Sequence, residues 1–214
     1  MKFYKETNFK ETPIGKIPKD WKAVSLKEVA EINPEQCEPA KQFPDKKFLY
    51  IDISSIEDGR IKGHKEFLGR DAPSRARRII RENDILMSTV RPYLKAFALV
   101  PKEYEGQICS TGFAVLRCKK NVHPYYLLSA IFSDNVIRQC NAMMVGGQYP
   151  ALNQSHVEKI KIPLPTFTEQ QKIAEILSSA DDILCLKKKK KEKLVRMKRR
   201  LMDLLLTGKV RVSV

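Results

Sequence analysis

The sequence predicts an α+β (mixed α/β) globular domain followed by one long C-terminal helix of the coiled-coil type. Short segments with strand character mix irregularly with a few helical segments over the first 165 residues. An unbroken helical pattern then follows two prolines, Pro163 and Pro165. The chain has 214 residues, enough for one core of about 150 residues and an appendage. The predicted divisions are a globular domain over 1–165, a helix over 166–207 and a tail over 208–214.

The first third of the chain contains helix, strand and turn signals in succession. Residues 1–24 are predicted to be a polar arm, and Ser25 with Glu28 forms a capping box that starts a short helix. The Pro-, Glu- and Lys-rich stretch 33–45 is predicted to be a loop, and residues 47–56 a strand. Asp58-Gly59 is typical of a tight turn.

Further strands are expected at DILMSTV (84–90), AFALV (96–100) and ICSTGFAVLRC (108–118). Each segment is rich in β-branched or aromatic residues and is bounded by Pro, Gly or charge. Together they predict that most of the sheet lies in the middle of the chain.

Helical signals return after these strands. His123-Pro124 is expected to open a helix, because Pro is favoured at the first helical position. One face of that helix would carry Leu127, Leu128, Ile131, Val136 and Ile137. Residues 144–154 are predicted to be a loop, and Ser155 with Glu158 a capping box that opens at most one turn. KIKIPLP, at 159–165, is the last predicted strand.

The long helix has clear start and stop signals. Thr166 with Glu169, or Thr168 with Gln171, provides a capping box, and Thr207-Gly208 provides the expected end. The helix would have about 38 residues and a length of ~57 Å.

Seam positions along this helix follow a strict alternation of three and four residues, which is typical of a coiled coil. They are Ile173, Ile176, Ala180, Ile183, Lys187, Lys190, Leu194, Met197, Leu201 and Leu204. Such a stripe indicates a partner helix from another chain or another copy. The alternative is a long terminal helix lying across its own domain. The predicted helix interface comprises Ile173, Ile176, Ile183, Leu194, Met197, Leu201 and Leu204.

The charge is strongly basic, because 40 Lys and Arg face 25 Asp and Glu, giving +15. This favours a polyanionic partner, nucleic acid before an anionic membrane surface, over a merely basic protein. Residues 187–200 contain ten basic residues and one acid. This run fits a solvated helix face, a DNA contact or an acidic partner.

A second basic cluster covers residues 60–81, with eight Lys or Arg and two acids. Its Gly, Pro and Ser predict loops that can enter a DNA groove. The candidate DNA contacts are Arg75, Arg77, Arg78, Arg91 and Lys95, with Lys62 and Lys65 on phosphates. Gln148, Tyr149 and Asn153 are candidate base readers, since Gln and Asn can pair with adenine. The alternatives are backbone-only contacts for the basic residues and ordinary turn chemistry for the loops.

Signatures of catalysis, metal binding and secretion are missing from the sequence. Five cysteines show no C-x-x-C spacing, and three histidines match no metal pattern. There is no P-loop, no glycine-rich cofactor loop and no N/D-P-P-Y/F tetrapeptide of the methyltransferases. The start of the chain lacks the apolar region of a signal peptide, and no run of 18 apolar residues occurs. We therefore expect a cytoplasmic, non-membrane protein without catalytic residues, metal or cofactor.

Several segments resemble the specificity (S, HsdS) subunit of type I restriction-modification systems. They are IGKIPKDWKAVSLKEVAEI, NDILMSTVRPYLKAFALVP, CSTGFAVLR, and VEKIKIPLPTFTEQQKIAEILSSADDI running to LLLTGKVRV. The resemblance covers nearly the whole chain. It implies a target recognition domain for one half of a bipartite DNA site. It also implies a spacer helix that docks the modification (methyltransferase) subunits, and no chemistry by the subunit itself.

This chain departs from the resemblance in one respect, since a full family member carries two recognition domains and two helical regions. The expectation is a natural half-subunit that pairs two copies through the long helices on double-stranded DNA with an interrupted palindrome. A restriction (translocase/nuclease) subunit is a further partner that the resemblance allows. The competing hypotheses are a non-specific nucleic-acid-binding or scaffold protein with a basic helix, and a nuclease that works alone.

Overall fold

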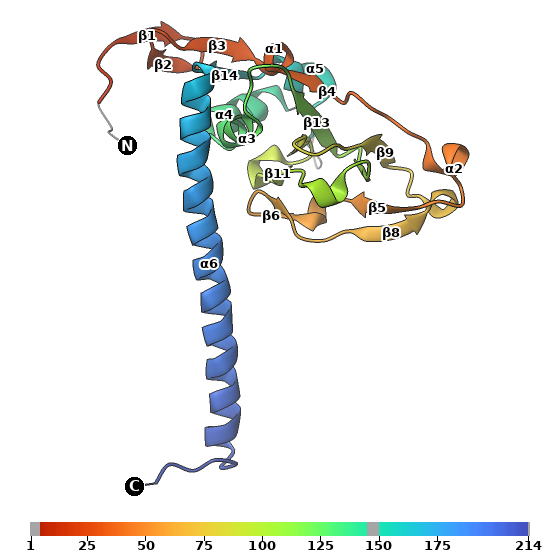
Figure 1. Ribbon diagram of the computed structural model, residues 1–214, viewed down its shortest axis with the longest axis vertical. Coiled ribbons are helices and arrows are strands. Elements are labelled where there is room, and N and C mark those ends of the chain that lie inside the picture. The colour runs from red at the N-terminus through yellow and green to blue at the C-terminus, as the bar shows by residue number, and fades with distance from the viewer. Residues whose placement is uncertain (1–4, 145–149, 214) are drawn as a thin grey trace. The chain divides into compact units, whose positions relative to one another are not determined.

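The computed structural model describes residues 5–144 and 150–213 of the chain (Figure 1). The chain forms two compact units, with the division between Ala174 and Glu175. The first unit is globular and contains every strand among the described residues. The second is helical, so the predicted α+β class with one long C-terminal helix is confirmed.

One four-stranded antiparallel sheet lies at the centre of the globular unit. In spatial order its strands are β11 (Phe97–Leu99), β10 (Ile85–Ser88), β13 (Phe113–Cys118) and β4 (Ala30–Ile32). All four residues of β10 are buried, which fits its three consecutive apolar residues, and the buried Ser88 hydroxyl donates to Val90 O at 2.7 Å.

A second four-stranded sheet mixes parallel and antiparallel pairing. Its spatial order is β8 (Lys65–Leu68), β5 (Lys47–Ile51), β12 (Ile108–Ser110) and β9 (Ala76–Ile79). Strands β8 and β9 therefore lie at opposite edges of this sheet, although their sequences are close together.

Three strand pairs complete the unit. They are β1 (Phe9–Thr12) with β2 (Gly15–Pro18), β3 (Lys22–Ser25) with β14 (Lys161–Leu164), and β6 (Ile56–Glu57) with β7 (Arg60–Ile61). The β6–β7 hairpin confirms the predicted Asp58-Gly59 turn. Both turn residues have positive φ, +50° and +75°, as a two-residue hairpin turn of this kind requires.

Six α-helices occur among the described residues. They are α1 (Leu26–Val29), α2 (Pro39–Gln42), α3 (Pro124–Ile131), α4 (Asp134–Met143), α5 (Gln154–Lys159) and α6 (Phe167–Leu206). The main core packs α3 to α5 against the central sheet, with Leu127, Ile131 and Val136 fully buried. Figure 1 shows α3 and α4 near the end with β3 and β14, while β5 and β8 lie at the other end of the unit.

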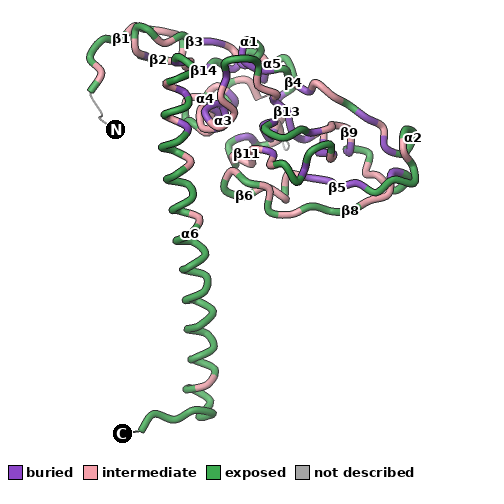
Figure 2. Tube along the Cα trace, viewed as in Figure 1, coloured by how far each residue is buried: buried purple, intermediate pink, exposed green. Residues whose placement is uncertain are grey.

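Helix α6 begins as the sequence predicts. Thr166 Oγ1 accepts a hydrogen bond from the backbone N–H of Glu169 at 3.4 Å, so the first of the two possible capping boxes marks the start. The side chains of Gln170 and Ala174 are buried, and Figure 2 shows most of the rest of α6 as exposed. Gln170 holds this first part by accepting from His123 N–H at 2.9 Å and donating to Pro165 O at 3.0 Å. Gly208 follows the helix with φ of +68°.

Several local predictions were wrong, each because a distant partner decided the outcome. Within the described residues 5–24, the predicted arm instead contains a hairpin of β1 and β2, followed by β3, which pairs with β14. The strand predicted at 47–56 ends at Ile51 and continues as a 3₁₀ turn over Ile53–Ser55. The loop predicted over 33–45 contains α2.

The segment 108–118 forms two strands in different sheets. The chain turns at Thr111-Gly112, where Ser110 Oγ accepts from Gly112 N–H at 3.1 Å. A Cβ at Gly112 would lie 2.9 Å from Ile53 Cδ1, so a larger residue here would require the Ile53 side chain to shift.

Two helical predictions also change. The helix expected after Pro124 divides at Ser133, whose side chain caps α4 by accepting from Val136 N–H at 3.4 Å. The cap of α5 is Asn153 rather than Ser155, since Asn153 Oδ1 accepts from His156 N–H at 2.8 Å.

Candidate nucleic-acid interface

Four loops of the globular unit are joined by backbone hydrogen bonds into one continuous surface. Thr111 N–H donates to Arg75 O at 2.9 Å, and Thr89 N–H donates to Gly112 O at 2.8 Å. Leu152 N–H donates to Thr89 O at 2.9 Å, and Arg91 N–H donates to Pro150 O at 3.2 Å. We call this surface the loop edge and define it as residues 74–75, 89–95, 111–112 and 150–153.

The loop edge brings together three predicted DNA contacts that are far apart in the sequence. Arg75, Arg91 and Asn153 are all exposed on it. Asn153 uses its side-chain oxygen to cap α5, and its amide nitrogen lies 3.5 Å from His156 Nε2. Gln148 and Tyr149, the other two candidate base readers, lie outside the described residues.

Lys95 closes a short 3₁₀ turn on the loop edge, Pro92–Leu94, which Arg91 precedes. Its ammonium group pairs with Asp134 at 3.1 Å, and that carboxylate is 91% exposed. Such an exposed pair is weak and can exchange for a phosphate. Lys95 therefore remains compatible with the predicted DNA contact.

The basic cluster at 60–81 is dispersed by the fold. Its Gly, Pro and Ser were expected to form loops, and loops occur at 62–64 and 72–75, but the rest of the cluster mostly forms β7, β8 and β9. Lys65 lies on β8 and pairs with Asp52 at 2.7 Å, at the sheet edge opposite β9. Lys62 is exposed beside it, so neither lysine belongs to the loop edge. The predicted phosphate contacts and the loop edge are thus separate surfaces.

Arg77 and Arg78, both on β9, differ from exposed DNA-contacting side chains. Arg77 forms an ion pair with Glu38 at 2.6 Å and donates to Ser74 O at 3.0 Å. Arg78 is half-buried opposite Cys109, its Nη1 has no hydrogen-bond partner, and burial lowers the pKa of its guanidinium. Neither presents a free guanidinium at the surface in this conformation.

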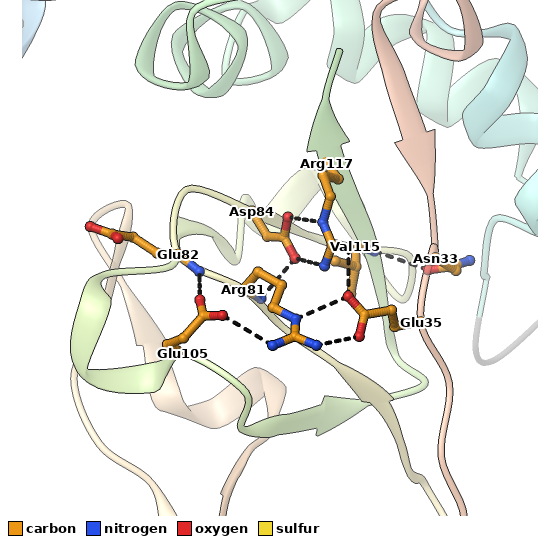
Figure 3. A network of polar contacts seen from close by, with 8 residues as sticks. All are labelled: Asn33, Glu35, Arg81, Glu82, Asp84, Glu105, Val115 and Arg117. Carbon is orange, nitrogen blue, oxygen red and sulfur yellow. Dashed lines mark hydrogen bonds and ion pairs between the residues drawn. The ribbon is translucent and has the colours of Figure 1, made fainter. Parts of the chain in front are cut away.

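A polar network, which the sequence did not reveal, holds the backbone behind the basic cluster (Figure 3). Arg117 donates from Nε and Nη2 to the Asp84 carboxylate, both at 2.9 Å, and from Nη1 to Glu35 at 2.6 Å. Arg81 donates to Glu35 at 3.0 and 2.7 Å, to Glu105 at 3.1 Å, and from its backbone to Asp84 at 2.8 Å. We call Glu35, Arg81, Asp84, Glu105 and Arg117 the ion-pair network.

The electrostatics of the network favour the charged forms. Hydrogen bonds from Arg81, and then from Arg117, lower the pKa of Glu35 to about 2. The Asp84 carboxylate raises the pKa of the Arg117 guanidinium, and the Glu35 carboxylate raises that of Arg81. Arg81 is thus held by two carboxylates through its side chain and by a third through its backbone, although its side chain is 44% exposed. The sequence alone does not indicate that Glu35 lies opposite Arg81 and Arg117, because these residues come together only in the folded protein.

Asn33 links strand β13 to the first residue of helix α5. Its side-chain oxygen accepts from Val115 N–H at 3.0 Å, and its amide donates to Gln154 Oε1 at 3.1 Å. Gln154 follows Asn153 directly. The buried amide of Asn33 therefore connects β13 to the loop at 150–153.

Cysteines, metal ligands and membrane spans add no further candidate site in the described part of the chain. The five cysteines are free, and burial raises the pKa of Cys118 and Cys140 to about 12. Within residues 5–144 and 150–213, no three His, Cys, Asp or Glu are placed to hold a metal ion. Over the same residues, no helix combines the length and apolar character needed to cross a bilayer.

Comparison with known proteins gives a consistent result. A family model described as the type I restriction modification DNA specificity domain matches residues 18–196. The type I restriction enzyme MjaVIII specificity subunit of Methanocaldococcus jannaschii is 28% identical over 98% of this chain and 51% of its own length. The putative type I restriction enzyme MjaX specificity subunit of the same organism is 33% identical over 97% of this chain and 50% of its own length.

Solved structures give the same picture. The crystal structure of the HsdS subunit from Thermoanaerobacter tengcongensis is 38% identical with a TM-score of 0.74, over 90% of this chain and 49% of that one. The type I restriction-modification system S subunit from M. genitalium, at 16% identity and a TM-score of 0.52, shares the fold. The chain spans about half the length of the relatives it matches.

Proposed function

Because the chain belongs to the family of type I restriction modification DNA specificity domains, we propose that it is a sequence-specific DNA-binding subunit. Each chain would recognise one half of a bipartite duplex site. The observation that carries the proposal is the extent of the family match, residues 18–196, which includes the loop edge and most of α6. The charge of +15 supports a polyanionic partner.

The loop edge is our candidate for base recognition. Loops held by a rigid scaffold are the usual place for binding residues, and the backbone bonds among these four loops provide such a scaffold. Arg75 and Arg91 supply guanidinium groups suited to guanine or phosphate, and Asn153 supplies an amide suited to adenine. Lys62 and Lys65, on a separate surface, would add phosphate contacts.

Pairing of two copies through α6 would join two half-sites. Most apolar seam side chains of this helix are exposed in the single chain, including Ile183 at 55%, Leu194 at 54% and Met197 at 60%. Exposed apolar residues in heptad order need a partner helix. Two identical chains would form a two-fold dimer, so the DNA site would be an interrupted palindrome. The domain division would be recognition over 1–165, pairing over 166–207 and a tail over 208–214.

The remaining parts of the proposal concern partners and chemistry. The chain would recruit the modification (methyltransferase) subunit and, in a complete system, a restriction subunit, inside the cytoplasm. It would carry out no catalytic step, and those subunits would supply the chemistry.

Selection of binding sites from a random duplex library tests the function directly. The purified chain should enrich one short sequence and its inverted repeat, separated by unspecified bases. Enrichment of two unrelated half-sites would contradict the homodimer while keeping the DNA function. A failure to enrich any sequence would contradict the function itself.

The seam is tested by the solution mass of a charged variant. The triple variant Leu194→Glu, Met197→Glu and Leu201→Glu should be a monomer, because it places six acidic side chains within one paired seam. A matched control is Val195→Glu with Met202→Glu, whose parent residues are also exposed but lie one position beyond the seam. Light scattering should show a dimer for the wild type and the control. A dimeric triple variant would exclude this seam as the interface.

A second candidate function has one observation in its favour. Residues 187–200 carry ten basic residues and are exposed throughout. Such a helix can coat phosphates without regard to sequence. Binding that falls steeply with salt and is equal on all duplexes would favour this non-specific or scaffold role.

A further inference from the structure

The turn at residues 91–95 has an unusual backbone. Six non-glycine residues in the described part of the chain have positive φ, and four of them are Asn or Asp, which tolerate this conformation. The other two are Arg91 (φ 47°) and Lys95 (φ 53°), at the two ends of this one turn. Long side chains in the left-handed region indicate strain that the surrounding structure maintains, which is a frequent mark of a functional segment.

The turn is held firmly from several directions. Within it, Leu94 N–H donates to Arg91 O and Lys95 N–H to Pro92 O, both at 2.9 Å. Outside it, Arg91 N–H donates to Pro150 O at 3.2 Å. Pro92 is buried beneath. Backbone hydrogen bonds and a buried proline therefore hold the strained turn in place.

That tip is apolar and exposed. Leu94 is 65% exposed and Tyr93 is 44% exposed. Over the described residues of the globular unit, the other large hydrophobic side chains that are exposed to solvent are Phe9 and Phe167. Leu94 is thus the most exposed large apolar side chain of that unit, at the centre of a turn that is strained and fixed.

We propose that Tyr93 and Leu94 form an apolar wedge that inserts against a base step of the DNA, while Arg91 and Lys95 contact the flanking phosphates. This inference rests on the proposed function and names how the loop edge meets its substrate. The apolar parts of a duplex are the thymine methyl groups and the stacked base faces, and both lie inside the grooves. Basic residues at each end of the tip would hold it there.

Charge favours DNA over a protein as the occupant. Cationic side chains bracket the wedge, and Arg75 lies on the same loop edge through the Thr111 and Thr89 bonds. The Lys95–Asp134 pair is exposed and can give way to a phosphate. An apolar tip surrounded by positive charge matches a polyanion with an apolar interior.

The test uses the full chain and the DNA site that it selects. Leu94→Ser should lower affinity by about tenfold or more, because base contacts and stacking contribute strongly to binding. The slope of log affinity against log salt should not change, since no phosphate contact is lost. Lys95→Ala should instead reduce that slope by about one. The matched control is Phe9→Ser, which removes another exposed apolar side chain of the same unit.

A fluorescent base reports insertion itself. A 2-aminopurine placed at successive positions of the site should brighten at one step on binding, since unstacking relieves quenching, and Leu94→Ser should abolish that signal. Leu94→Met should keep much of the affinity and of the fluorescence signal that Leu94→Ser loses. If Leu94 acted only through the shape of the loop, this difference between the two variants would not be explained.

The outcomes separate the two proposals. If the wild type selects no site, the proposed function fails before the wedge is tested. If the wild type binds its site and Leu94→Ser binds equally well, the wedge is overturned while the function stands. If Leu94→Ser binds DNA normally but no longer binds the methyltransferase subunit, the tip is a protein contact and the inference is wrong.

Discussion

The ion-pair network and the loop edge use the same residue type in opposite ways. Arg81 and Arg117 donate to carboxylates on every side, and Asp84 between them is only 1% exposed. Arg75 and Arg91 are exposed on loops that are joined mainly through backbone bonds. The difference teaches that positive charge alone does not mark a binding residue. A guanidinium that donates to several carboxylates of its own domain, such as that of Arg117, stabilises the fold, whereas an exposed guanidinium on a loop can also meet a ligand.

The largest effect should come from removing the buried carboxylate of the network. Asp84→Ala leaves Arg117 without its two-point partner and leaves the backbone N–H of Arg81 unsatisfied, so it should cost about 3–5 kcal/mol of unfolding free energy. Urea unfolding measures this. The control is Glu105→Ala, because Glu105 is 45% exposed and should cost less than about 1 kcal/mol. Equal losses in both variants would show that the network is not centred on Asp84.

Effects of intermediate size should distinguish the arginines of the ion-pair network from those of the loop edge. Arg81→Ala should cost about 1–3 kcal/mol in stability, through loss of charged hydrogen bonds, with little change in DNA affinity of the folded protein. Arg75→Ala should change stability by less than about 0.5 kcal/mol and lower DNA affinity by about tenfold. Unfolding and DNA titrations on both variants complete the comparison. The reverse pattern would invert the assignment of the two regions.

The smallest effect should be a loss of folding stability at acidic pH. The pKa of Glu35 is lowered to about 2 in the folded protein. Its contribution to stability is therefore present above its ordinary pKa of about 4.5 and is lost as the pH falls toward 2. Solvent screening limits this contribution to about 1 kcal/mol. Between about pH 5 and pH 2, stability should fall less in Glu35→Gln than in the wild type. Parallel curves would remove Glu35 from the acid response.

Local sequence signals predicted the elements that depend on local physics. The Asp58-Gly59 turn, the capping box at Ser25 and Glu28, and the start and end of α6 were all confirmed. In each case neighbouring residues supply both the conformation and its hydrogen bonds. The strands at Ile85–Ser88 and Phe97–Leu99 were found for the same reason, since their apolar runs are short and bounded.

Predictions that depended on distant partners were less complete. The segment 108–118 looked like one strand, but its first part pairs with β5 and β9 and its second part pairs with β10 and β4. The candidate site was similarly divided. Arg75, Arg91 and Asn153 were identified by residue type, but nothing local to Leu94 or Tyr93 signalled that both would be exposed on a strained tip.

The sequence by itself determined the fold class, the long helix with its exposed seam, and the basic character that points to DNA. These follow from periodicity, capping and net charge, which are sums over neighbouring residues. Only the tertiary structure decided which basic side chains form ion pairs within the protein and which stay exposed. Arg77 and Arg81 lie on or beside β9, within reach of Glu38, Glu35 and Glu105, whereas Arg75 lies on a loop whose backbone alone is held. The physical reason is that an ion pair depends on distance in space, and β-sheet pairing brings together residues that the sequence keeps apart.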